Sequence, residues 1–440
     1  MTASGARNPF TRRNSATARA CVLASCVTMT FMATTATAVA PTATPSLRSS
    51  YVVTVATPAD LSAVLRSTHI APDFVYSHAL VGFAAQLPPS LAHVLASDPL
   101  VTGIVKDAEG RVRSRLSNDF SSPAQAVPSG VRYVRADHSP TARIDGRDDP
   151  MDVDVAILDS GIDAGHPDLN VAGGFSCVQK RSALKDALGH GTAVAGIVGA
   201  RDNGFGVVGV APGARLWSVR VLDDRGAGKL SQVLCGLDWV MANASRMEVA
   251  NMSIEFDTQS LEDGCGVQSH GPSAARTIDP MHLAVCALTA AGKTIVAAAG
   301  NHYTDARLSL PGAYRQVITT SAIADFNGHF GGAPSAPSCR DGVQQTDDTF
   351  AGFSNFGPRV DIAAPGVCIA TTAPAGKYAY ASGTSFATPH VTGAVALLLS
   401  KHAGMYPSDV QAALIAASTH QRYPGDPDGI FEPTLDTTAL

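Results

Sequence analysis

The apolar residues near the start of the chain fall in short segments that predict a small mixed domain. Between residues 50 and 113, the predicted strands cover residues 51–55, 80–87 and 101–105, and the predicted helices cover residues 59–67 and 89–96. A polar linker rich in serine, asparagine and proline follows at residues 114–128. We therefore expect a compact α+β domain at residues 50–113, joined to the remainder by an exposed segment.

Beyond this linker the pattern changes to apolar strands that alternate with helices. Strands are predicted at residues 153–158, 216–222, 249–253, 294–299 and 317–321. Helices are predicted at residues 192–199, 230–242, 281–291, 391–399 and 407–417. Continuous apolar strands separated by helices are typical of a parallel sheet that is covered on both faces. The larger part of the chain is therefore expected to be an α/β domain with a mostly parallel central sheet.

Four polar residues are placed by this pattern at one edge of the sheet. Asp159 follows the strand at residues 153–158, and Asn301 follows the strand at residues 294–299. His190 and Ser385 each stand at the entrance of a predicted helix. Ligands of such sheets bind beyond the carboxyl ends of the strands. We therefore expect these four side chains to lie together.

These four residue types can carry out acyl transfer. A serine before an apolar helix is by itself most often a capping residue, but His190 could act as the base that activates Ser385. A buried carboxylate at Asp159 would hold the imidazole in one tautomer. The Asn301 amide and the Ser385 backbone N–H would bind the oxyanion of the tetrahedral intermediate.

The segments around these residues resemble the signature sequences of the subtilisin family of serine endopeptidases. The four segments are Asp159-Ser160-Gly161-Ile162, His190-Gly191-Thr192-Ala193-Val194-Ala195-Gly196, Ala298-Ala299-Gly300-Asn301 and Gly383-Thr384-Ser385-Phe386-Ala387-Thr388-Pro389. They occur in the family's order, and the similarity extends from about residue 124 to residue 420. The resemblance implies a subtilisin-like three-layer fold and a secreted serine endopeptidase of the actinobacterial type that hydrolyses polypeptides through an acyl-enzyme.

Other functional classes fit the sequence less well. Ser385 stands in a Gly-Thr-Ser-Phe-Ala segment close to the nucleophile elbow of lipases, but in those enzymes the serine precedes the histidine. A glycine pattern at residues 204–209 has its helix before it and its strand after it, so a nucleotide site and an organic cofactor are not expected. Two alternatives remain: an esterase that uses the same serine, and a catalytically weak subtilase that serves as a binding module, which Glu255 favours.

A calcium site is implied by further residues that match the family. The loop at residues 201–207 resembles the family's high-affinity calcium loop, and calcium prefers several oxygen ligands. The implied ligands are the side chains of Gln125, Asp168 and Asn203 and the backbone carbonyls of Arg201, Phe205 and Val207.

The position of Gln125 implies that the mature chain begins shortly before it. Residues 50–113 would then form a ferredoxin-like propeptide domain, similar to the inhibitor-like propeptides of subtilases. Residues 114–124 would be a processing linker, cut by the enzyme itself between about Arg115 and Ala124, and residues 125–440 would be the peptidase domain.

The N-terminal residues have the three parts of a secretory signal, which we place at residues 1–40: arginines, a modest apolar stretch and small residues before a cleavage point. Residues 23–26 form a rival lipoprotein-type signal, but the apolar stretch continues beyond Cys26. No stretch is long enough to span a bilayer, so no stable membrane association is expected. The net charge of −5 gives no basic stripe for nucleic acid, and a monomer is expected.

Once the signal at residues 1–40 is removed, six cysteines are left. An even set in an exported chain indicates disulfides. Fifteen pairings are possible from the sequence. The family resemblance implies Cys177–Cys235, Cys265–Cys286 and Cys339–Cys368.

The resemblance also places the substrate along two segments, Met252-Ser253-Ile254 and Ala297-Ala298-Ala299-Gly300, where an extended peptide would add as a strand. The small residues Ala298, Ala299 and Gly300 imply an open, apolar first pocket, and large apolar side chains are therefore expected there. Glu255 departs from the glycine that is usual in the family. This anion would narrow a distal pocket or select basic side chains.

Overall fold

The computed structural model describes residues 48–117, 120, 124–258, 265, 278–331, 339 and 345–440, which belong to one compact unit. The expected signal at residues 1–40 lies outside these ranges, as do residues 118, 119 and 121–123 of the expected processing linker. No helix of the described part is long and apolar enough to cross a membrane.

The small N-terminal domain is the expected α+β unit, with one strand that the sequence did not predict. Its elements are β1 (Ser49–Val55), α1 (Pro58–Thr68), β2 (Phe74–Tyr76), β3 (Gly82–Leu87), α2 (Pro89–Ala96) and β4 (Val101–Lys106). The strands form an antiparallel sheet in the order β2-β3-β1-β4. Buried apolar side chains from the strands and both helices form a separate core, which includes Val53, Phe83 and Leu95.

Two short strands, β5 (Glu109–Arg111) and β6 (Arg115–Ser117), connect this domain to the large one. The helices of the large domain are α3 (Ser129–Tyr133), η1 (Ala136–His138), α4 (His190–Gly199), α5 (Leu230–Ala242), α6 (Pro280–Ala290), η2 (Ala306–Leu308), α7 (Thr384–Lys401) and α8 (Pro407–Ala417). Its strands are β7 (Asp154–Asp159), β8 (Val171–Ser176), β9 (Arg215–Arg220), β10 (Ala227–Lys229), β11 (Val249–Met252), β12 (Phe256–Asp257), β13 (Thr294–Ala298), β14 (Ser309–Leu310), β15 (Ile318–Ala324), β16 (Thr349–Phe350), β17 (Ile362–Pro365), β18 (Ile369–Ala373) and β19 (Lys377–Ser382).

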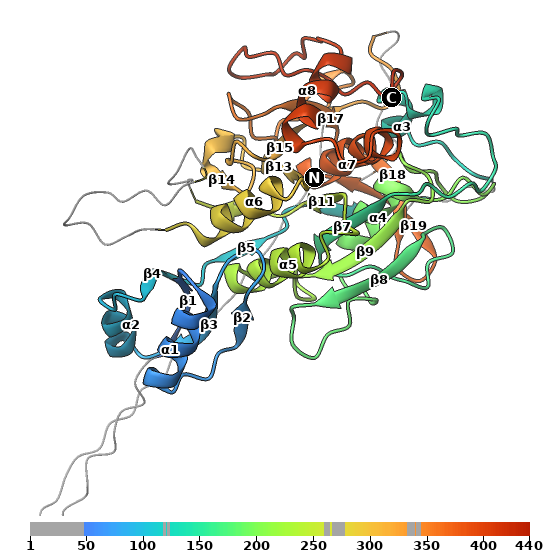
Figure 1. The fold of residues 1–440 in the computed structure, drawn as a ribbon. Helices are drawn as coiled ribbons and strands as arrows, with labels where there is room; N and C mark the ends of the chain where they lie inside the picture. Colours follow the sequence, from blue (N-terminus) through green and yellow to red (C-terminus); the bar gives the residue numbers. More distant parts are fainter. Residues whose placement is uncertain are drawn as a thin grey trace, which may run out of the picture. The chain divides into compact units, whose positions relative to one another are not determined.

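The central sheet has eight strands in the order β16-β15-β13-β11-β7-β9-β8, with β17 beside β15. Its pairings are parallel except that of β16 with β15. Alternate residues of β7 face different cores: Val155 and Ile157 join the cluster that contains α4 and α7, whereas Ala156 and Leu158 join the cluster that contains α5 and α6. The sheet is therefore the middle of three layers, as expected (Figure 1).

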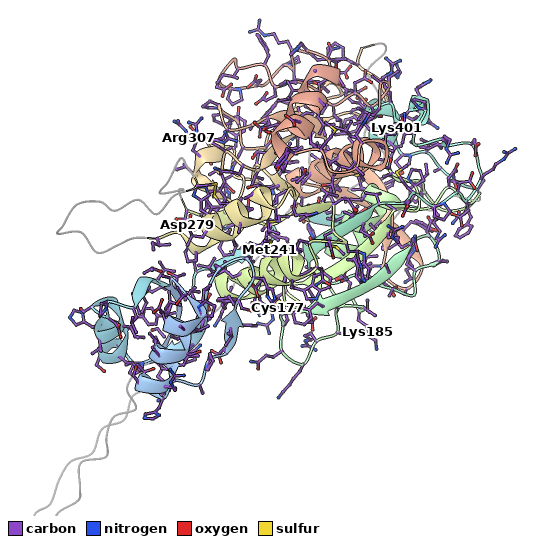
Figure 2. The ribbon with its side chains drawn as sticks, in the orientation of Figure 1. Cys177, Lys185, Met241, Asp279, Arg307 and Lys401 are labelled. Atoms are coloured by element: carbon purple, nitrogen blue, oxygen red, sulfur yellow. A yellow bond between two sulfur atoms is a disulfide. The ribbon has the colours of Figure 1, made fainter. Side chains whose placement is uncertain are left out.

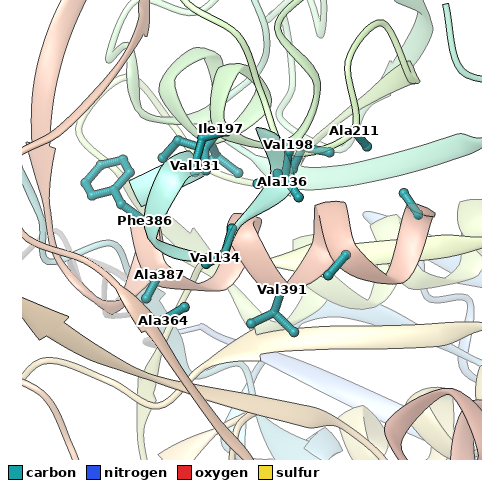
Figure 3. Packing of buried hydrophobic residues seen from close by; sticks show 14 of the residues in the cluster. Val131, Val134, Ala136, Ile197, Val198, Ala211, Ala364, Phe386, Ala387 and Val391 are labelled. Atoms are coloured by element: carbon teal, nitrogen blue, oxygen red, sulfur yellow. The ribbon is translucent and has the colours of Figure 1, made fainter. Parts of the chain in front are cut away.

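Helix α7 is deeply buried at the site. Its side chains from Thr384 to Leu399 are all buried. Phe386, Ala387 and Val391 are among the side chains that pack into the apolar cluster with Ile197 of α4 and Ala364 of β17 (Figure 3). Packing on all sides fixes this helix, and with it the residues at its N-terminus.

The small domain is held to α5 by buried and half-buried polar contacts. Asp107 accepts hydrogen bonds from the backbone N–H and the hydroxyl of Ser231, at 2.8 and 2.7 Å, in the first turn of α5. This carboxylate also lies at the positive end of the helix dipole. Farther along α5, Asp238 accepts backbone N–H groups of His78 (2.7 Å) and Ala79 (2.8 Å). Tyr76 donates its hydroxyl to the carbonyl of Ser231 at 3.0 Å.

The three disulfides implied by the resemblance are confirmed. Cys177, labelled in Figure 2, is bonded to Cys235 of α5. The other bonds are Cys265–Cys286 and Cys339–Cys368. Each closes a loop of the unfolded chain, and such a bond contributes roughly 2–4 kcal/mol in the chain-entropy description.

Candidate active site

Asp159 and His190 meet at the edge of the central sheet. Asp159 is the last residue of β7, whereas the sequence predicted it directly after the strand. His190 is the first residue of α4. The imidazole Nδ1 lies 2.8 Å from Oδ1 and 2.9 Å from Oδ2 of the carboxylate. His190 is 1% exposed and Asp159 is fully buried. In this environment the carboxylate fixes the tautomer with the proton on Nδ1, which leaves Nε2 as the basic nitrogen.

Asp186 organises the entrance of α4, and the sequence analysis did not identify it. Its carboxylate accepts the backbone N–H of Gly189 (2.9 Å) and of Thr192 (2.8 Å), which are otherwise unsatisfied at a helix start. It also accepts the hydroxyl of Ser160 at 2.9 Å, directly after Asp159. Burial raises the pKa of Asp186, while these donors oppose the shift. An acidic residue four positions before His190 and just before a helix was the available signal.

Ser385 lies at the N-terminus of α7 with its hydroxyl directed toward Ser253. The hydroxyl donates to the Ser253 carbonyl at 3.2 Å. His190 Nε2 is buried and has no hydrogen bond, so the expected bond between His190 and Ser385 is not formed in this conformation. The His190 ring does lie close to the first turn of α7, because its centroid is 5.1 Å from that of Phe386, the residue after Ser385. Rotation of the small Ser385 side chain about its Cα–Cβ bond moves the hydroxyl away from Ser253.

Ser253 has a second role that the sequence did not indicate. Pro389 lies inside α7 and has no N–H, so the carbonyl of Ser385, four residues earlier, lacks its usual helical partner. The Ser253 hydroxyl donates to this carbonyl at 2.8 Å. Asn251 in turn donates to the Ser253 oxygen at 2.9 Å. This chain of hydrogen bonds ties the start of α7 to the end of β11.

Asn301 faces the same helix entrance. Its Oδ1 accepts the backbone N–H of Thr384 at 2.8 Å and the Thr384 hydroxyl at 3.1 Å. The NH₂ group at the other end of the Asn301 amide is therefore available to donate hydrogen bonds to a ligand. Asn355 supports the turn that carries Asn301: it donates to the Ala299 carbonyl at 2.9 Å and accepts the His302 N–H at 3.0 Å. The sequence analysis did not identify Asn355 as part of the site.

An extended segment of the chain itself runs through the cleft. Strand β5 pairs antiparallel with β10, and Arg111 exchanges backbone hydrogen bonds with Glu255 at 2.9 and 3.1 Å. Val112 donates its N–H to the carbonyl of Gly226 at 3.0 Å. The segment thus lies between β10 and the chain after β11. On the other side of Ser385, β6 pairs antiparallel with β19.

This segment uses one of the two edges that were expected for a substrate. It pairs with Glu255, directly after Ser253 and Ile254, whereas β13 pairs with β11 and β15. Its other neighbour is β10, whose sequence Ala-Gly-Lys shows little strand pattern. Ala298, Ala299 and Gly300 instead line the site beside Asn301.

The residues implied as calcium ligands also come together. Gln125 Oε1 accepts the N–H groups of Asn203 and Gly204, both at 2.8 Å. Asp168 is fully buried, and its carboxylate accepts Asn203 Nδ2 (2.9 Å) and the Val207 N–H (3.0 Å). Burial raises the pKa of Asp168 to about 6. In this structure hydrogen-bond donors hold the carboxylate, and the charge of Arg201 also acts on it. A buried carboxylate beside side-chain amides and a backbone loop is nevertheless a combination of groups that fits Ca²⁺.

Sequence comparisons identify the family. The sequence model of the family described as "Subtilase family" matches residues 151–431 of this chain. Subtilisin NAT of Bacillus subtilis subsp. natto is 34% identical over 338 residues, which cover 77% of this chain and 75% of that protein. A subtilisin of Bacillus pumilus is 36% identical over 298 residues, which cover 68% of this chain and 93% of that protein.

A comparison of structures gives the same result. The crystal structure of a cold-adapted subtilisin-like serine proteinase matches with a TM-score of 0.51 at 28% identity, covering 68% of this chain and 97% of the other. The extent of both matches, over the part of the chain that carries Asp159, His190, Asn301 and Ser385, leads to one conclusion: this chain belongs to the subtilase family, peptidase S8, of subtilisin-type serine proteases.

Proposed function

We propose that the protein is a secreted serine endopeptidase that is made as a self-processed zymogen and cleaves polypeptides through an acyl-enzyme. The observation that carries this proposal is the buried Asp159–His190 pair beside the entrance of α7, where Ser385 stands. No residue in this group needs a cofactor for acyl transfer.

The roles of the residues follow from their positions. Ser385 Oγ attacks the substrate carbonyl while His190 Nε2 takes its proton, and Asp159 stabilises the imidazolium that forms. The NH₂ group of Asn301 and the backbone N–H of Ser385 donate to the oxyanion, aided by the positive end of α7. His190 then returns the proton to the leaving amine, and water releases the acyl group by the same steps in reverse.

The small domain is the inhibitor in this proposal. Its contacts with α5 hold it beside the cleft, and its C-terminal extension enters the cleft as an added strand. The substrate sites are therefore filled for as long as the small domain stays bound. Residues 1–40 direct export, and the three disulfides suit an oxidising compartment.

Labelling with a fluorophosphonate probe, together with casein hydrolysis, tests the function. We expect the processed protein to be labelled on Ser385 and to degrade casein, and both properties to disappear after pretreatment with phenylmethylsulfonyl fluoride. Labelling with ester hydrolysis but no casein hydrolysis would favour the esterase. Absence of labelling in the processed protein would favour the binding module.

We also propose that Gln125, Asp168, Asn203 and the carbonyls of the 201–207 loop hold Ca²⁺. The ion would compensate the buried Asp168 carboxylate and bind only the folded chain. When the free Ca²⁺ concentration is about 100 times the dissociation constant, binding adds about 2.7 kcal/mol to the free energy of unfolding.

The calcium proposal predicts a melting temperature that falls by roughly 5 °C or more when excess chelator is added. The measurement is differential scanning calorimetry of the processed enzyme, inactivated with phenylmethylsulfonyl fluoride to prevent autolysis. The variant Asp168→Asn should melt at the same temperature with and without chelator. A wild-type melting curve that is unchanged by chelator would contradict the site.

A further inference from the structure

The strand pairings on the two sides of the cleft identify the peptide bond that faces Ser385. Between the last backbone contact of the β5 side and the first pair of β6 stand two residues, Arg113 and Ser114. Gly383, two residues before Ser385, approaches this point so closely that a Cβ on it would lie 3.1 Å from Ser114 Cβ. These contacts place Ser114 beside the turn that leads into Ser385, and the Arg113–Ser114 bond is the bond at Ser114 on the side of the β5 pairing.

The Arg113 side chain lies against two carboxylates. Its Nε is 3.1 Å from Glu255 Oε1, and its Nη2 is 2.9 Å from Asp257 Oδ2. The contact with Glu255 falls outside hydrogen-bond geometry, since Oε1 has no hydrogen bond. The guanidinium nevertheless supplies the positive charge that this buried oxygen faces. His302 borders the other side, with Nε2 at 3.5 Å from Asp257 Oδ1.

Glu255 is a fixed part of this pocket. It is 3% exposed, and its Oε2 accepts the backbone N–H of Asn301 at 3.0 Å. Gly300, with φ of +106°, lies close to it: a Cβ there would meet Asn355 Nδ2 at 2.4 Å, Ser309 Oγ at 2.9 Å and Glu255 Oε2 at 3.0 Å. The carboxylate therefore lies beside the residue that binds the oxyanion. It belongs to the first pocket, not to a distal one.

We propose that this pocket selects arginine as the residue that supplies the acyl group, and that the precursor cuts itself between Arg113 and Ser114. The inference rests on the proposed peptidase function. A planar guanidinium reaches both carboxylates at once, whereas the ammonium of lysine is a single point charge, so lysine should be the weaker substrate. A preference for arginine replaces the preference for large apolar side chains that we expected from Ala298, Ala299 and Gly300. The proposed cut lies just before residues 115–124, where the sequence analysis placed the self-cleavage.

The self-cleavage step needs no reactant other than water. The Ser385 Oγ forms a bond to the Arg113 carbonyl carbon, and the bond to the Ser114 nitrogen breaks after His190 returns the proton to that nitrogen. Water then attacks the ester and releases a new C-terminus at Arg113. The products are the small domain ending in arginine and a mature chain that begins with Ser114.

The environment of Glu255 adds a dependence on pH. Burial raises the pKa of Glu255 to about 7, and Asp257 contributes to the rise, whereas the Asn301 N–H and the charges of Arg113 and Arg111 oppose it. Protonation below this pH removes the charge that attracts arginine. The preference for arginine over a neutral side chain should therefore fall as the pH drops from 8 to 6. His302 also faces this carboxylate, with Nδ1 at 3.8 Å from Glu255 Oε2. The ratio of two substrates cancels effects of pH on the catalytic step that both substrates share.

Two measurements test the inference. N-terminal sequencing of the first processing product of the wild-type chain should give Ser114, and sequencing of later products would detect further trimming. Peptide amides that differ only in arginine, lysine or phenylalanine before the cut bond should rank in that order by kcat/KM. The variant Glu255→Gln should lower the arginine to phenylalanine ratio by about 10-fold or more, because it removes the charge that faces the guanidinium at close range.

Two further variants control this experiment. Asp257→Asn should lower the ratio by less, since that carboxylate is half exposed and its ion pair is screened. Asp409→Asn, an equivalent change on the exposed face of α8, should leave the ratio unchanged.

The possible results separate the two proposals. A wild-type enzyme that is labelled by the fluorophosphonate and cuts casein, but prefers phenylalanine at every pH, would overturn the arginine pocket and leave the peptidase function standing. A first cut at another bond would overturn the assignment of Arg113. Failure of labelling would instead remove the peptidase function itself. If Glu255→Gln does not fold, the wild-type sequencing and substrate ranking still decide the question.

Discussion

The variant Ser385→Ala should accumulate as the uncut precursor and show no measurable hydrolysis of casein. The change removes the only atom that forms a bond with the substrate carbonyl. Loss of the nucleophile lowers kcat by about 2 × 10⁶-fold in subtilisin itself, and we carry that magnitude over from the relative and do not derive it from this structure. The measurements are electrophoresis of the secreted chain and a casein assay of the purified protein.

Stability should change little in this variant, because the Ser385 hydroxyl makes one hydrogen bond, to the carbonyl of Ser253. The matched control is Ser400→Ala on the same helix, whose hydroxyl bonds only the nearby Leu397 carbonyl at 2.8 Å. That variant should be processed normally. Normal processing of Ser385→Ala in a host without other proteases would exclude Ser385 as the nucleophile.

The variant Asp159→Asn should fold and lose about 10⁴-fold in kcat. The backbone N–H of Ser160 donates to Asp159 Oδ1 at 2.7 Å, so an asparagine would place its oxygen there. Its NH₂ group would then face His190 Nδ1 and force that nitrogen to accept. The proton would move to Nε2, where it prevents the ring from acting as a base.

A kinetic assay with a peptide amide, together with ¹⁵N NMR of the imidazole, measures both parts of this prediction. The spectrum should report the tautomer with the proton on Nε2 at alkaline pH. Activity should recover partly as hydroxide replaces the missing base. A variant with the original tautomer and near wild-type kcat would show that Asp159 has no orienting role.

The parts of the fold that the sequence predicted well have strong local signals. The bounds of α2, α5 and α8 match the predicted ranges, and α2 and α8 begin with proline, which suits the first helical turn. The strands of the central sheet are continuous apolar runs, so their order in the chain also indicated a parallel sheet. The convergence of Asp159, His190, Asn301 and Ser385 followed from that topology.

The missed parts depend on partners that are distant in the chain. Strand β10 has the sequence Ala-Gly-Lys, and it forms because β5 of the small domain lies beside it. Asn355 acts through backbone groups of a distant segment, which no residue pattern reveals. Asp186 differs, because its place just before a helix was a signal that the sequence offered. The direction of the Ser385 hydroxyl depends on competition between the Ser253 carbonyl and His190, two acceptors that only the folded arrangement brings near it.

The attachment of the small domain determines what happens after the chain is cut. The N-terminal fragment keeps its hold on α5 through Asp107 and Asp238, neither of which is near the broken bond. The other new end is held by the short pairing of β6 with β19 and by the packing of Phe120 against Tyr378 and Tyr380. Cleavage alone therefore produces a blocked enzyme, and the rate at which active molecules appear is set by dissociation or destruction of the bound fragment. Onset of activity should consequently lag behind the appearance of the cut chain.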